Sequence, residues 1–546
     1  MKKVFVSLFI CLWTSLCLCG QTKRITDAAQ SVPHVIEFKM LPGERWWGGI
    51  DHFKRDMDGN KFTLPLDSGS RVYLDMRQNY TNHAVPFFLS SCGRYVWSDE
   101  PFEIWFENGA IKVSGAQDLT LVEAGTSLRE AFLHASARHF PPSGRIPEEI
   151  FLSNPQYNTF IELTNPTQAG VLKYAHDIVA NGFPSDAVLM IDAGWAKYHG
   201  NFSPDKDKFP DMKSMCDLLH AMGFKVMLWV VPFVSPDTKE FLVLEKKGYL
   251  VMRKDVDEPY ISKWWGGYSA VVDMTNPDAK AFYINALKDV RERYGVDGFK
   301  FDAGDYYSYK QTEVRVFDDV SYDSRHGEKW AELSRDFPFH EFRACWKMAG
   351  QPVVQRLQDK DYSWDGVGLL LPSMLASAME GHQFVCPDMI GGGQFATFVG
   401  IDEDKFDQEL IVRSCQIHAM MPMMQFSVAP WRILNKENLE ICRRAACMHR
   451  EMAPYLLGQA RKCAESGEPI LRPMDYAFPG EGFEGCLDQY MLGEELLVAP
   501  MVTPGTSREV RLPAGRWVDE YGKTYKGGRT YTIDVPLDRI PRFTSK

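Results

Sequence analysis

Apolar runs that alternate with amphipathic segments of helical periodicity are the feature that most constrains the fold of this chain. The apolar run at 187–191 precedes a helical pattern over 212–222, and the run at 225–231 precedes another over 238–247. Two more pairs follow, in which the helical patterns 278–294 and 369–379 lead into the apolar runs 298–301 and 383–388. Apolar strands joined by helices are typical of a parallel sheet. The repetition between residues 150 and 460 therefore predicts a (β/α)8 barrel.

The stretches on either side of the predicted barrel have the pattern of antiparallel β-structure. Residues 25–145 contain short alternating segments, such as 71–76 and 102–106, separated by Gly, Asp and Asn, and predict an N-terminal β-sandwich. Residues 465–546 contain further short apolar segments at 490–492, 496–500, 509–513, 515–518 and 531–535. They predict a C-terminal antiparallel β domain. The expected fold class is therefore α/β, a TIM barrel flanked by these two β domains.

Residues 1–20 have the composition of a secretory signal peptide. Lys2 and Lys3 precede the apolar run 4–13, and small and apolar residues continue through Gly20. Cys19 follows a bulky leucine, whereas a small residue is usual before a lipidated cysteine, so lipidation is the less favoured alternative. No later stretch has the roughly 18 uncharged apolar residues that are needed to cross a bilayer. We expect a secreted or periplasmic protein, with a lipid-anchored surface protein as the alternative.

Charge and cysteine content exclude several classes of partner. The formal net charge is −11 over 546 residues, without a basic block, so neither nucleic acid nor an anionic membrane surface is an expected partner. Three of the twelve cysteines lie in or beside the predicted signal peptide. The other nine show neither a CxxC pair nor metal-site spacing, so we expect most of them to be buried. No cofactor or metal is expected, and the oligomeric state is open.

Acidic residues recur where predicted strands end. Asp192, Asp302 and Asp388 each follow or close such a strand, and Asp359 and Asp361 lie in one later loop. Any one of them alone could cap a helix, bind a metal or be solvated. In a barrel, however, the carboxyl ends of the strands converge on one pocket. Two carboxylates together with aromatic residues, and without a cluster of histidines, suit glycoside hydrolysis. We therefore predict a sugar-binding pocket.

The segment Phe-Lys-Phe-Asp-Ala-Gly-Asp at 299–305 matches the nucleophile strand of glycoside hydrolase family 31, the retaining α-glycosidases. The chain resembles this family over about residues 40–540, and most of all its myogenesis-regulating glycosidase-like branch. The resemblance implies that Asp302 is the nucleophile, which forms a covalent glycosyl intermediate.

The usual Trp-x-Gly-Asp-Asn pattern around the acid/base residue is absent, and Gln-Asp-Lys-Asp-Tyr-Ser-Trp at 358–364 replaces it. The acid/base residue is therefore assigned from its sequence separation from three other residues of the family pattern. Family members carry an Arg 16 residues before the acid, a Trp 5 after it and an Asp 29 after it. Only Asp359 satisfies all three offsets, with Arg343, Trp364 and Asp388. The resemblance thus implies Asp359 as general acid/base, with Asp361 as the alternative. A neighbouring carboxylate such as Asp361 could raise the pKa of the acid, or it could merely be solvated.

The resemblance also implies sugar-binding roles. Asp192 matches an acid that holds hydroxyls at the far edge of the −1 subsite, and Lys300 stands where related xylosidases also carry Lys. Arg343 matches the Arg beside the catalytic acid, Asp388 a sugar-site acid, and Trp265 a sugar-contacting Trp of the nearest branch.

Four other residues allow a structural interpretation. Arg413 matches a family Arg-Trp motif in which Ser414 replaces the Trp, so it could equally form a buried ion pair. Trp229 is interpreted as barrel core in preference to substrate stacking. Asp305 could cap the next turn. A divalent metal between Asp302 and Asp305 is a disfavoured alternative, since no further oxygen-rich loop supports it.

The predicted activity is that of an exo-acting retaining α-glycosidase. Retention requires the two catalytic carboxyl groups to lie about 5–5.5 Å apart. The nearest branch prefers α-galactosides, so the resemblance implies an α-galactosidase, followed by an α-glucosidase and an α-xylosidase. A catalytically inactive sugar-binding homologue and a transglycosylase are the remaining alternatives.

Overall fold

The computed structural model describes residues 33–49, 54–78, 83–318, 322–393, 398 and 406–546. The predicted signal peptide and Cys19 lie outside these residues. Within them, no helix combines the length and the apolar character that a membrane span requires. All nine described cysteines are free and six of them are buried, as their scattered positions predicted.

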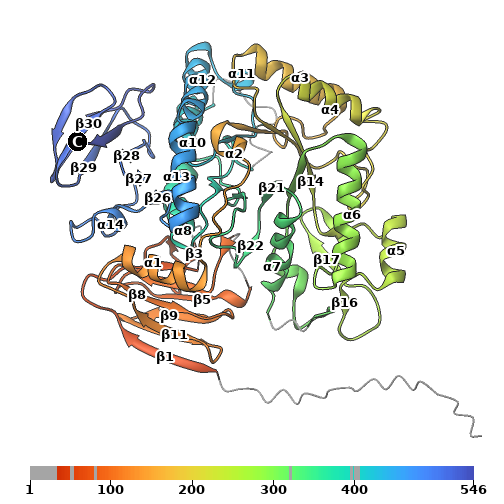
Figure 1. Cartoon of the computed structure of the whole chain (residues 1–546), viewed down its shortest axis with the longest axis horizontal. Coiled ribbons are helices and arrows are strands. Elements are labelled where there is room, and N and C mark those ends of the chain that lie inside the picture. The colour runs from red at the N-terminus through yellow and green to blue at the C-terminus, as the bar shows by residue number, and fades with distance from the viewer. Residues whose placement is uncertain (1–32, 50–53, 79–82, 319–321, 394–397, 399–405) are drawn as a thin grey trace, which may run out of the picture. The chain divides into compact units, whose positions relative to one another are not determined.

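Eight parallel strands form the central sheet, in the spatial order β24-β23-β21-β19-β14-β13-β12-β25. Two of them, β14 and β21, are labelled in Figure 1. In chain order they are β12 (Gln156–Asn158), β13 (Val188–Ile191), β14 (Lys225–Val230), β19 (Gly298–Phe301), β21 (Phe339–Phe342), β23 (Gln355–Arg356), β24 (Val385–Cys386) and β25 (Gln425–Phe426). A parallel bridge between Ile390 and Phe426 connects the segment after β24 to β25. The two ends of the sheet therefore meet, and the predicted barrel is confirmed.

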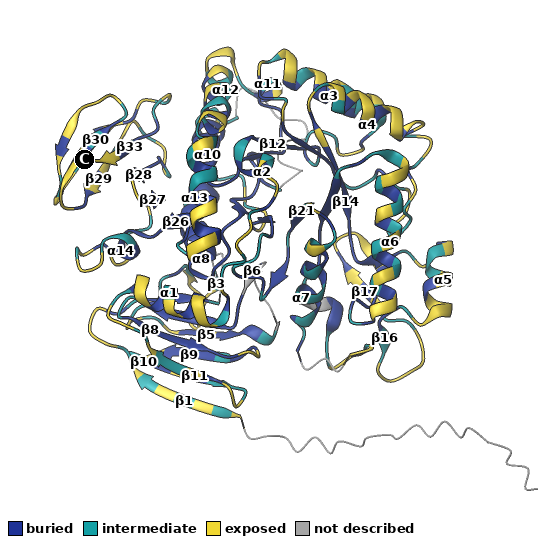
Figure 2. Cartoon of the chain, viewed as in Figure 1, coloured by how far each residue is buried: buried dark blue, intermediate teal, exposed yellow. Residues whose placement is uncertain are grey.

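Helices surround the barrel and have their polar faces toward solvent, whereas strands such as β14 and β21 are buried (Figure 2). The main ones are α3 (Gln168–Ala180), α4 (Met212–Ala221), α5 (Lys239–Lys247), α6 (Pro277–Tyr294), α7 (Arg325–Ala331), α8 (Trp364–Met379), α10 (Gln408–Ala419), α12 (Lys436–Glu451) and α13 (Ala453–Ser466). Local signals fix their ends. For example, the Asn276 side chain caps the first turn of α6, and the helix stops at Gly295, whose φ is 73°.

The N-terminal region contains two four-stranded antiparallel sheets, in agreement with the predicted sandwich. One has the order β1 (His34–Lys39), β10 (Ala110–Gly115), β9 (Glu103–Glu107), β5 (Val72–Asp75), and the other β11 (Thr120–Glu123), β8 (Arg94–Trp97), β7 (Phe87–Ser90), β2 (Trp46–Gly48). Trp46 and Trp47 are fully buried in its core. The stretch predicted as β-rich also contains a helix, α1 (Leu128–His139). It begins at Ser127, whose side chain accepts a hydrogen bond from the backbone N–H of Glu130, and it contacts β7 and β8.

The C-terminal region is antiparallel, as predicted. Its six-stranded sheet has the order β26 (Leu471–Arg472), β27 (Tyr490–Leu492), β28 (Leu496–Val498), β33 (Arg542–Ser545), β30 (Arg516–Asp519), β31 (Thr524–Lys526), and β29 (Ser507–Leu512) pairs with β32 (Arg529–Asp534). Arg413 of α10 is buried and donates hydrogen bonds to the carbonyl oxygens of Gly505 and Val535. Its role here is structural, since it links the barrel to the C-terminal domain.

Candidate active site

The carboxyl ends of the barrel strands surround a cavity of about 400 Å³. Its lining residues are Phe160, Asp192, Ala193, His199, Trp229, Trp264, Trp265, Gly266, Lys300, Asp302, Arg343, Arg356, Asp359 and Met389. Six of the seven predicted site residues are among them, although they come from positions 192 to 359 of the chain. Asp388 is the exception, because it lies behind the cavity wall and contacts Arg356.

Asp302 directly follows β19, and its side chain is fixed from two sides. The indole Nε1 of Trp229 donates to Oδ2 at 2.7 Å, and the backbone N–H of Ala303 donates to Oδ1 at 2.8 Å. The chain then turns sharply, because Ala303 has a φ of 58° and Gly304 a φ of 87°. A Cβ on Gly304 would lie 2.5 Å from the Trp330 ring, so only glycine fits this turn. The turn leaves the carboxylate at the end of the strand.

Neighbouring cations keep the Asp302 carboxylate ionised. Burial alone would raise its pKa, but Lys300, Arg343 and Arg356, together with the hydrogen bond from Trp229, outweigh burial and lower the pKa below its ordinary value. Lys300 Nζ lies 2.6 Å from Asp192 Oδ2, and both side chains are almost completely buried. This buried ion pair lines the same cavity as Asp302. An ionised, desolvated carboxylate is the form that a nucleophile requires.

Arg343 and Trp265 form a different part of the cavity wall. The Arg343 guanidinium stacks on the Trp265 ring, with its carbon 4.4 Å from the ring centroid, and its Nη1 lies 3.8 Å from Asp302 Oδ1. Trp265 occupies the tip of the hairpin formed by β17 (Ile261–Trp264) and β18 (Gly267–Val271), and it is 53% exposed. An exposed aromatic face over a cavity suits contact with a sugar ring.

Asp359 follows β23 and lines the same cavity as Asp302. Arg356 Nη1 donates to its Oδ1 at 2.7 Å. Its side chain is 38% exposed. Desolvation in the cavity raises the pKa of this carboxyl, but Arg356, Arg343 and Lys300 together outweigh that effect and lower the pKa to about 2. Asp361 does not line the cavity that holds Asp302. It lies, with Asp359, in a separate cavity of about 170 Å³.

Asp388 stands one layer further back. Its carboxylate is fully buried and accepts hydrogen bonds from Arg356 Nη1 at 2.7 Å and from the backbone N–H of Lys360 at 2.8 Å. Its φ of 67° is in the left-handed region, where a non-glycine residue is uncommon. The backbone turns here, which is why β24 covers only Val385–Cys386 of the predicted run 383–388. Direct contact between Asp388 and a sugar stays a prediction.

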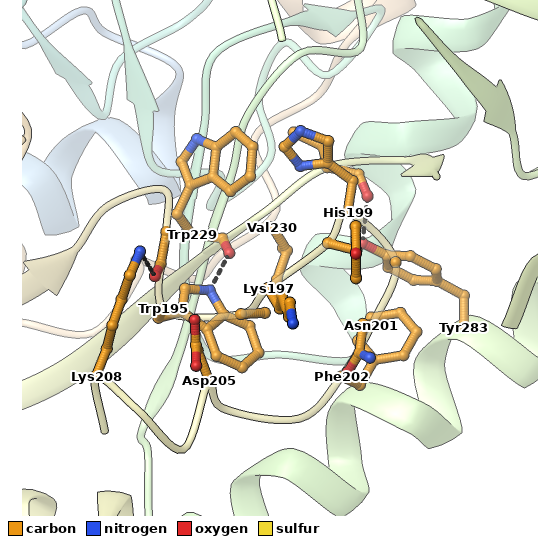
Figure 3. Close-up of a pocket in the computed structure, with 15 residues that line it drawn as sticks. Trp195, Lys197, His199, Asn201, Phe202, Asp205, Lys208, Trp229, Val230 and Tyr283 are labelled. Atoms are coloured by element: carbon orange, nitrogen blue, oxygen red, sulfur yellow. Dashed lines mark hydrogen bonds between the residues drawn. The ribbon is translucent and has the colours of Figure 1, made fainter. Parts of the chain in front are cut away.

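The sequence did not single out four residues of the cavity wall as functional: Trp229, Trp264, His199 and Arg356. Trp229 is largely buried, as its interpretation as core requires, yet it also holds Asp302. A second cavity, of about 360 Å³, is also lined by Trp229 and His199 (Figure 3). There, Trp195 Nε1 donates to the carbonyl oxygen of Trp229 at 2.7 Å and so fixes the donor to Asp302. The sequence signal that could have indicated a role for Trp229 is its position near the end of a barrel strand.

The described residues contain no group of three or more His, Cys, Asp or Glu side chains arranged to hold a metal ion. Asp305 occupies the N-cap position of the short helix η2 (Tyr306–Tyr309) without a side-chain capping hydrogen bond. It lies 4.0 Å from Arg343, so its observed contact is electrostatic.

Two protein-family models match this chain. Residues 156–459 match the model of the glycosyl hydrolases family 31 TIM-barrel domain, and residues 467–546 match the family 31 C-terminal domain. The chain belongs to glycoside hydrolase family 31. A mouse protein, myogenesis-regulating glycosidase, is 32% identical over 94% of this chain and 77% of its own length. The α-xylosidase XylQ of Lactiplantibacillus pentosus is 26% identical over 83% of this chain and 61% of its own.

Solved structures agree with the fold. The family 31 dextranase of Flavobacterium johnsoniae, determined with glucose, superposes with a TM-score of 0.80 at 22% identity, and the match covers 94% of this chain and 67% of the dextranase. The protein is thus a family 31 glycoside hydrolase, with its cavity at the end of the barrel where enzymes of this fold keep their chemistry. One departure from the family pattern lies in the wall: Arg356 stands three residues before Asp359, at the position of the usual Trp.

Proposed function

We propose that this family 31 enzyme is an exo-acting retaining α-glycosidase that prefers terminal α-galactosides. The observation that carries the proposal is the cavity that Asp302 and Asp359 line together, with Asp302 ionised and held by Trp229. Retaining glycosidases need one carboxylate as nucleophile and a second as acid and base.

The reaction takes two balanced steps. In the first, the Asp302 carboxylate attacks the anomeric carbon, the bond from that carbon to the leaving oxygen breaks, and Asp359 transfers its proton to that oxygen. In the second, ionised Asp359 takes a proton from water, the water oxygen attacks the same carbon, and Asp302 departs. Two inversions at one carbon return an α-configured sugar. A sugar hydroxyl in place of water would give transglycosylation.

A neutral terminal sugar suits the charges of the cavity. The lysine and the two arginines of the wall each lie near a carboxylate: Lys300 2.6 Å from Asp192, Arg356 2.7 Å from Asp359, and Arg343 3.8 Å from Asp302. Charges paired in this way offer oriented hydrogen-bond donors and acceptors to hydroxyl groups. The buried pair of Asp192 and Lys300 lines the cavity, and the exo mode of action rests on the resemblance to family 31.

The choice of sugar rests on the resemblance to the myogenesis-regulating glycosidase branch. Galactose and glucose differ in the configuration at C4, and xylose lacks the C6 group, so small changes in the wall change the preference. The α-xylosidase relative keeps an α-xylosidase among the alternatives. An α-glucosidase is the second candidate, and an inactive sugar-binding homologue is the non-enzymatic one.

The test is release of 4-nitrophenol from α-galactoside, α-glucoside and α-xyloside substrates by wild type, Asp302→Asn and Asp359→Asn. We expect highest turnover of the α-galactoside, its loss in Asp302→Asn, and partial rescue of Asp359→Asn by azide, which needs no general base. Proton NMR of the first product formed gives its anomeric configuration. Absence of turnover, together with saturable sugar binding, would favour the binding-protein alternative. Full activity of Asp359→Asn would transfer the acid role to Asp361.

A further inference from the structure

The buried Arg356 contacts three carboxylates that belong to three different strand ends. Its side chain is 2% exposed, and a single atom, Nη1, donates at 2.7 Å to both Asp359 and Asp388. On its other side, Nε lies 3.7 Å from Glu341 Oε1. Among the described residues, neither this Nε nor this Oε1 has a hydrogen-bond partner. A buried donor and acceptor that stay unpaired at such a distance are costly, and a small movement would pair them.

We propose that Arg356 is a positioning residue that holds the carboxylate of Asp359 and releases it by moving toward Glu341. This inference rests on the proposed function, because it assigns the control of the acid/base group. With Arg356 on Asp359, the carboxylate is kept ionised and ready to deprotonate water. With Arg356 on Glu341, Asp359 is free to carry the proton that the leaving oxygen needs. One arginine thus serves both steps, at the position where the family pattern has a Trp.

Among the charged groups around Asp359, Arg356 has the largest effect on the ionisation of its carboxyl. The other cations near it are Arg343, from the end of β21, and Lys300, from β19, and both are engaged with other carboxylates. Lys360, next in the chain, bonds to Asp388 and to the carbonyl oxygen of Met389. The facing carboxylates are Asp302 and Asp388, with Glu341 behind Arg356 and Asp361 and Lys61 in the adjoining cavity.

The position of Glu341 makes the movement of Arg356 feasible. Glu341 is 1% exposed, and its Oε2 accepts a hydrogen bond from Gln425 Nε2 at 2.6 Å, which leaves Oε1 directed toward Arg356. Burial raises the pKa of Glu341, and Arg356 opposes that shift. A closer contact with the guanidinium would therefore stabilise its ionised form. When the leaving group of the substrate lies against Asp359, it would favour the position of Arg356 on Glu341 over its position on Asp359.

The experiment is the pH profile of kcat/KM for hydrolysis of an α-linked disaccharide, whose poor leaving group needs protonation. In Arg356→Gln, Asp359 keeps its proton to higher pH, so the basic limb should move up by about 1–3 pH units. In Glu341→Gln, Arg356 loses its alternative partner, so the same limb should move down. Arg94→Gln, which breaks the buried pair of Arg94 with Glu44 in the N-terminal sandwich, is the matched control and should leave both limbs in place.

Shifts of the basic limb in opposite directions in Arg356→Gln and Glu341→Gln support the proposal. A purely structural role would lower kcat/KM at every pH and would move the limb of neither variant. Unmoved limbs, or shifts of the same sign, would overturn the proposal. Arg356→Lys, which retains a cation, covers the case in which Arg356→Gln does not fold, and it should give a smaller upward shift.

If the wild type hydrolyses none of the substrates, the proposed function fails but Arg356 can still be tested. Carbon-13 NMR of protein labelled at its aspartate carboxyl groups measures the pKa of Asp359. The Asp359 signal is the one that disappears in Asp359→Asn. A pKa that rises in Arg356→Gln supports the contact, and an unchanged pKa sinks it.

Discussion

At the scale of single residues, the orientation of Asp302 depends on a hydrogen bond from Trp229. Trp229→Phe keeps the aromatic bulk but removes the N–H that donates to Oδ2 at 2.7 Å. A hydrogen bond to a charged group contributes about 1.5–3 kcal/mol, so kcat/KM should fall by roughly 10- to 150-fold. Trp517→Phe, which removes a comparable buried N–H bond to Pro513 in the C-terminal domain, is the control. Equal kcat/KM in both variants would contradict this role of Trp229.

Lys300 gives a second prediction at this scale, on pH dependence. The pKa of Asp302 is lowered because Lys300 and other groups around this carboxyl outweigh burial, so the nucleophile stays ionised down to low pH. Without the Lys300 cation the pKa of Asp302 rises, and protonated Asp302 cannot attack. In Lys300→Met/Asp192→Asn, which removes both partners of the pair, the acidic limb of kcat/KM should move up by about one pH unit or more. Lys300→Arg keeps the charge and should leave the limb near its wild-type position. An acidic limb that moves down in the double variant would refute the assignment.

At the scale of elements, the β17–β18 hairpin places Trp264 and Trp265 over the cavity. A Cβ on Gly266 would lie 2.5 Å from the Trp264 ring, so Gly266→Ala must displace that ring. Overpacking of this kind costs about 1–3 kcal/mol, and KM should rise at least ~5-fold with a smaller change in kcat. Gly458→Ala in α13, where a Cβ meets nothing within 4 Å, is the matched control. Initial-rate kinetics on both variants decide the point, and an unchanged KM in Gly266→Ala would exclude a role of this hairpin in binding.

At the scale of the whole molecule, Arg413 couples the barrel to the C-terminal domain. Arg413→Met leaves the carbonyl oxygens of Gly505 and Val535 without this donor, and it breaks a pair with Glu409 at 3.5 Å. We expect the free energy of unfolding to fall by about 1–3 kcal/mol, the cost of leaving a buried hydrogen-bond acceptor without its partner. Arg444→Met breaks an exposed contact to Asp538 between the same two domains, and such pairs contribute about 0–1 kcal/mol. Urea denaturation of Arg413→Met and Arg444→Met compares the two contacts. Equal midpoints would argue against a role of Arg413 in coupling the barrel to the C-terminal domain.

The sequence predicted the barrel and the two flanking β domains, because the patterns that mark strands and helices are local. The strand at 188–191 follows from a continuous apolar run, and α6 follows from its helical periodicity, its cap at Asn276 and its stop at Gly295. The helix α1 was missed within a β-rich stretch, although its cap at Ser127 is a recognisable signal. The short strand β23 was also missed, because two residues are too few to show a period.

The sequence by itself predicted a barrel with acidic residues at its strand ends, and its resemblance to family 31 singled out Asp302 and Asp359 among them as the catalytic pair. Only the tertiary structure decided how these carboxylates are held. Trp229 is 73 positions from Asp302, and Glu341 faces Arg356 from a different strand. No periodicity along the chain encodes such contacts, because they depend on which strands become neighbours in the closed sheet. For the same reason, Asp388 was predicted in the cavity but lies behind its wall, where the left-handed turn and the buried guanidinium place it.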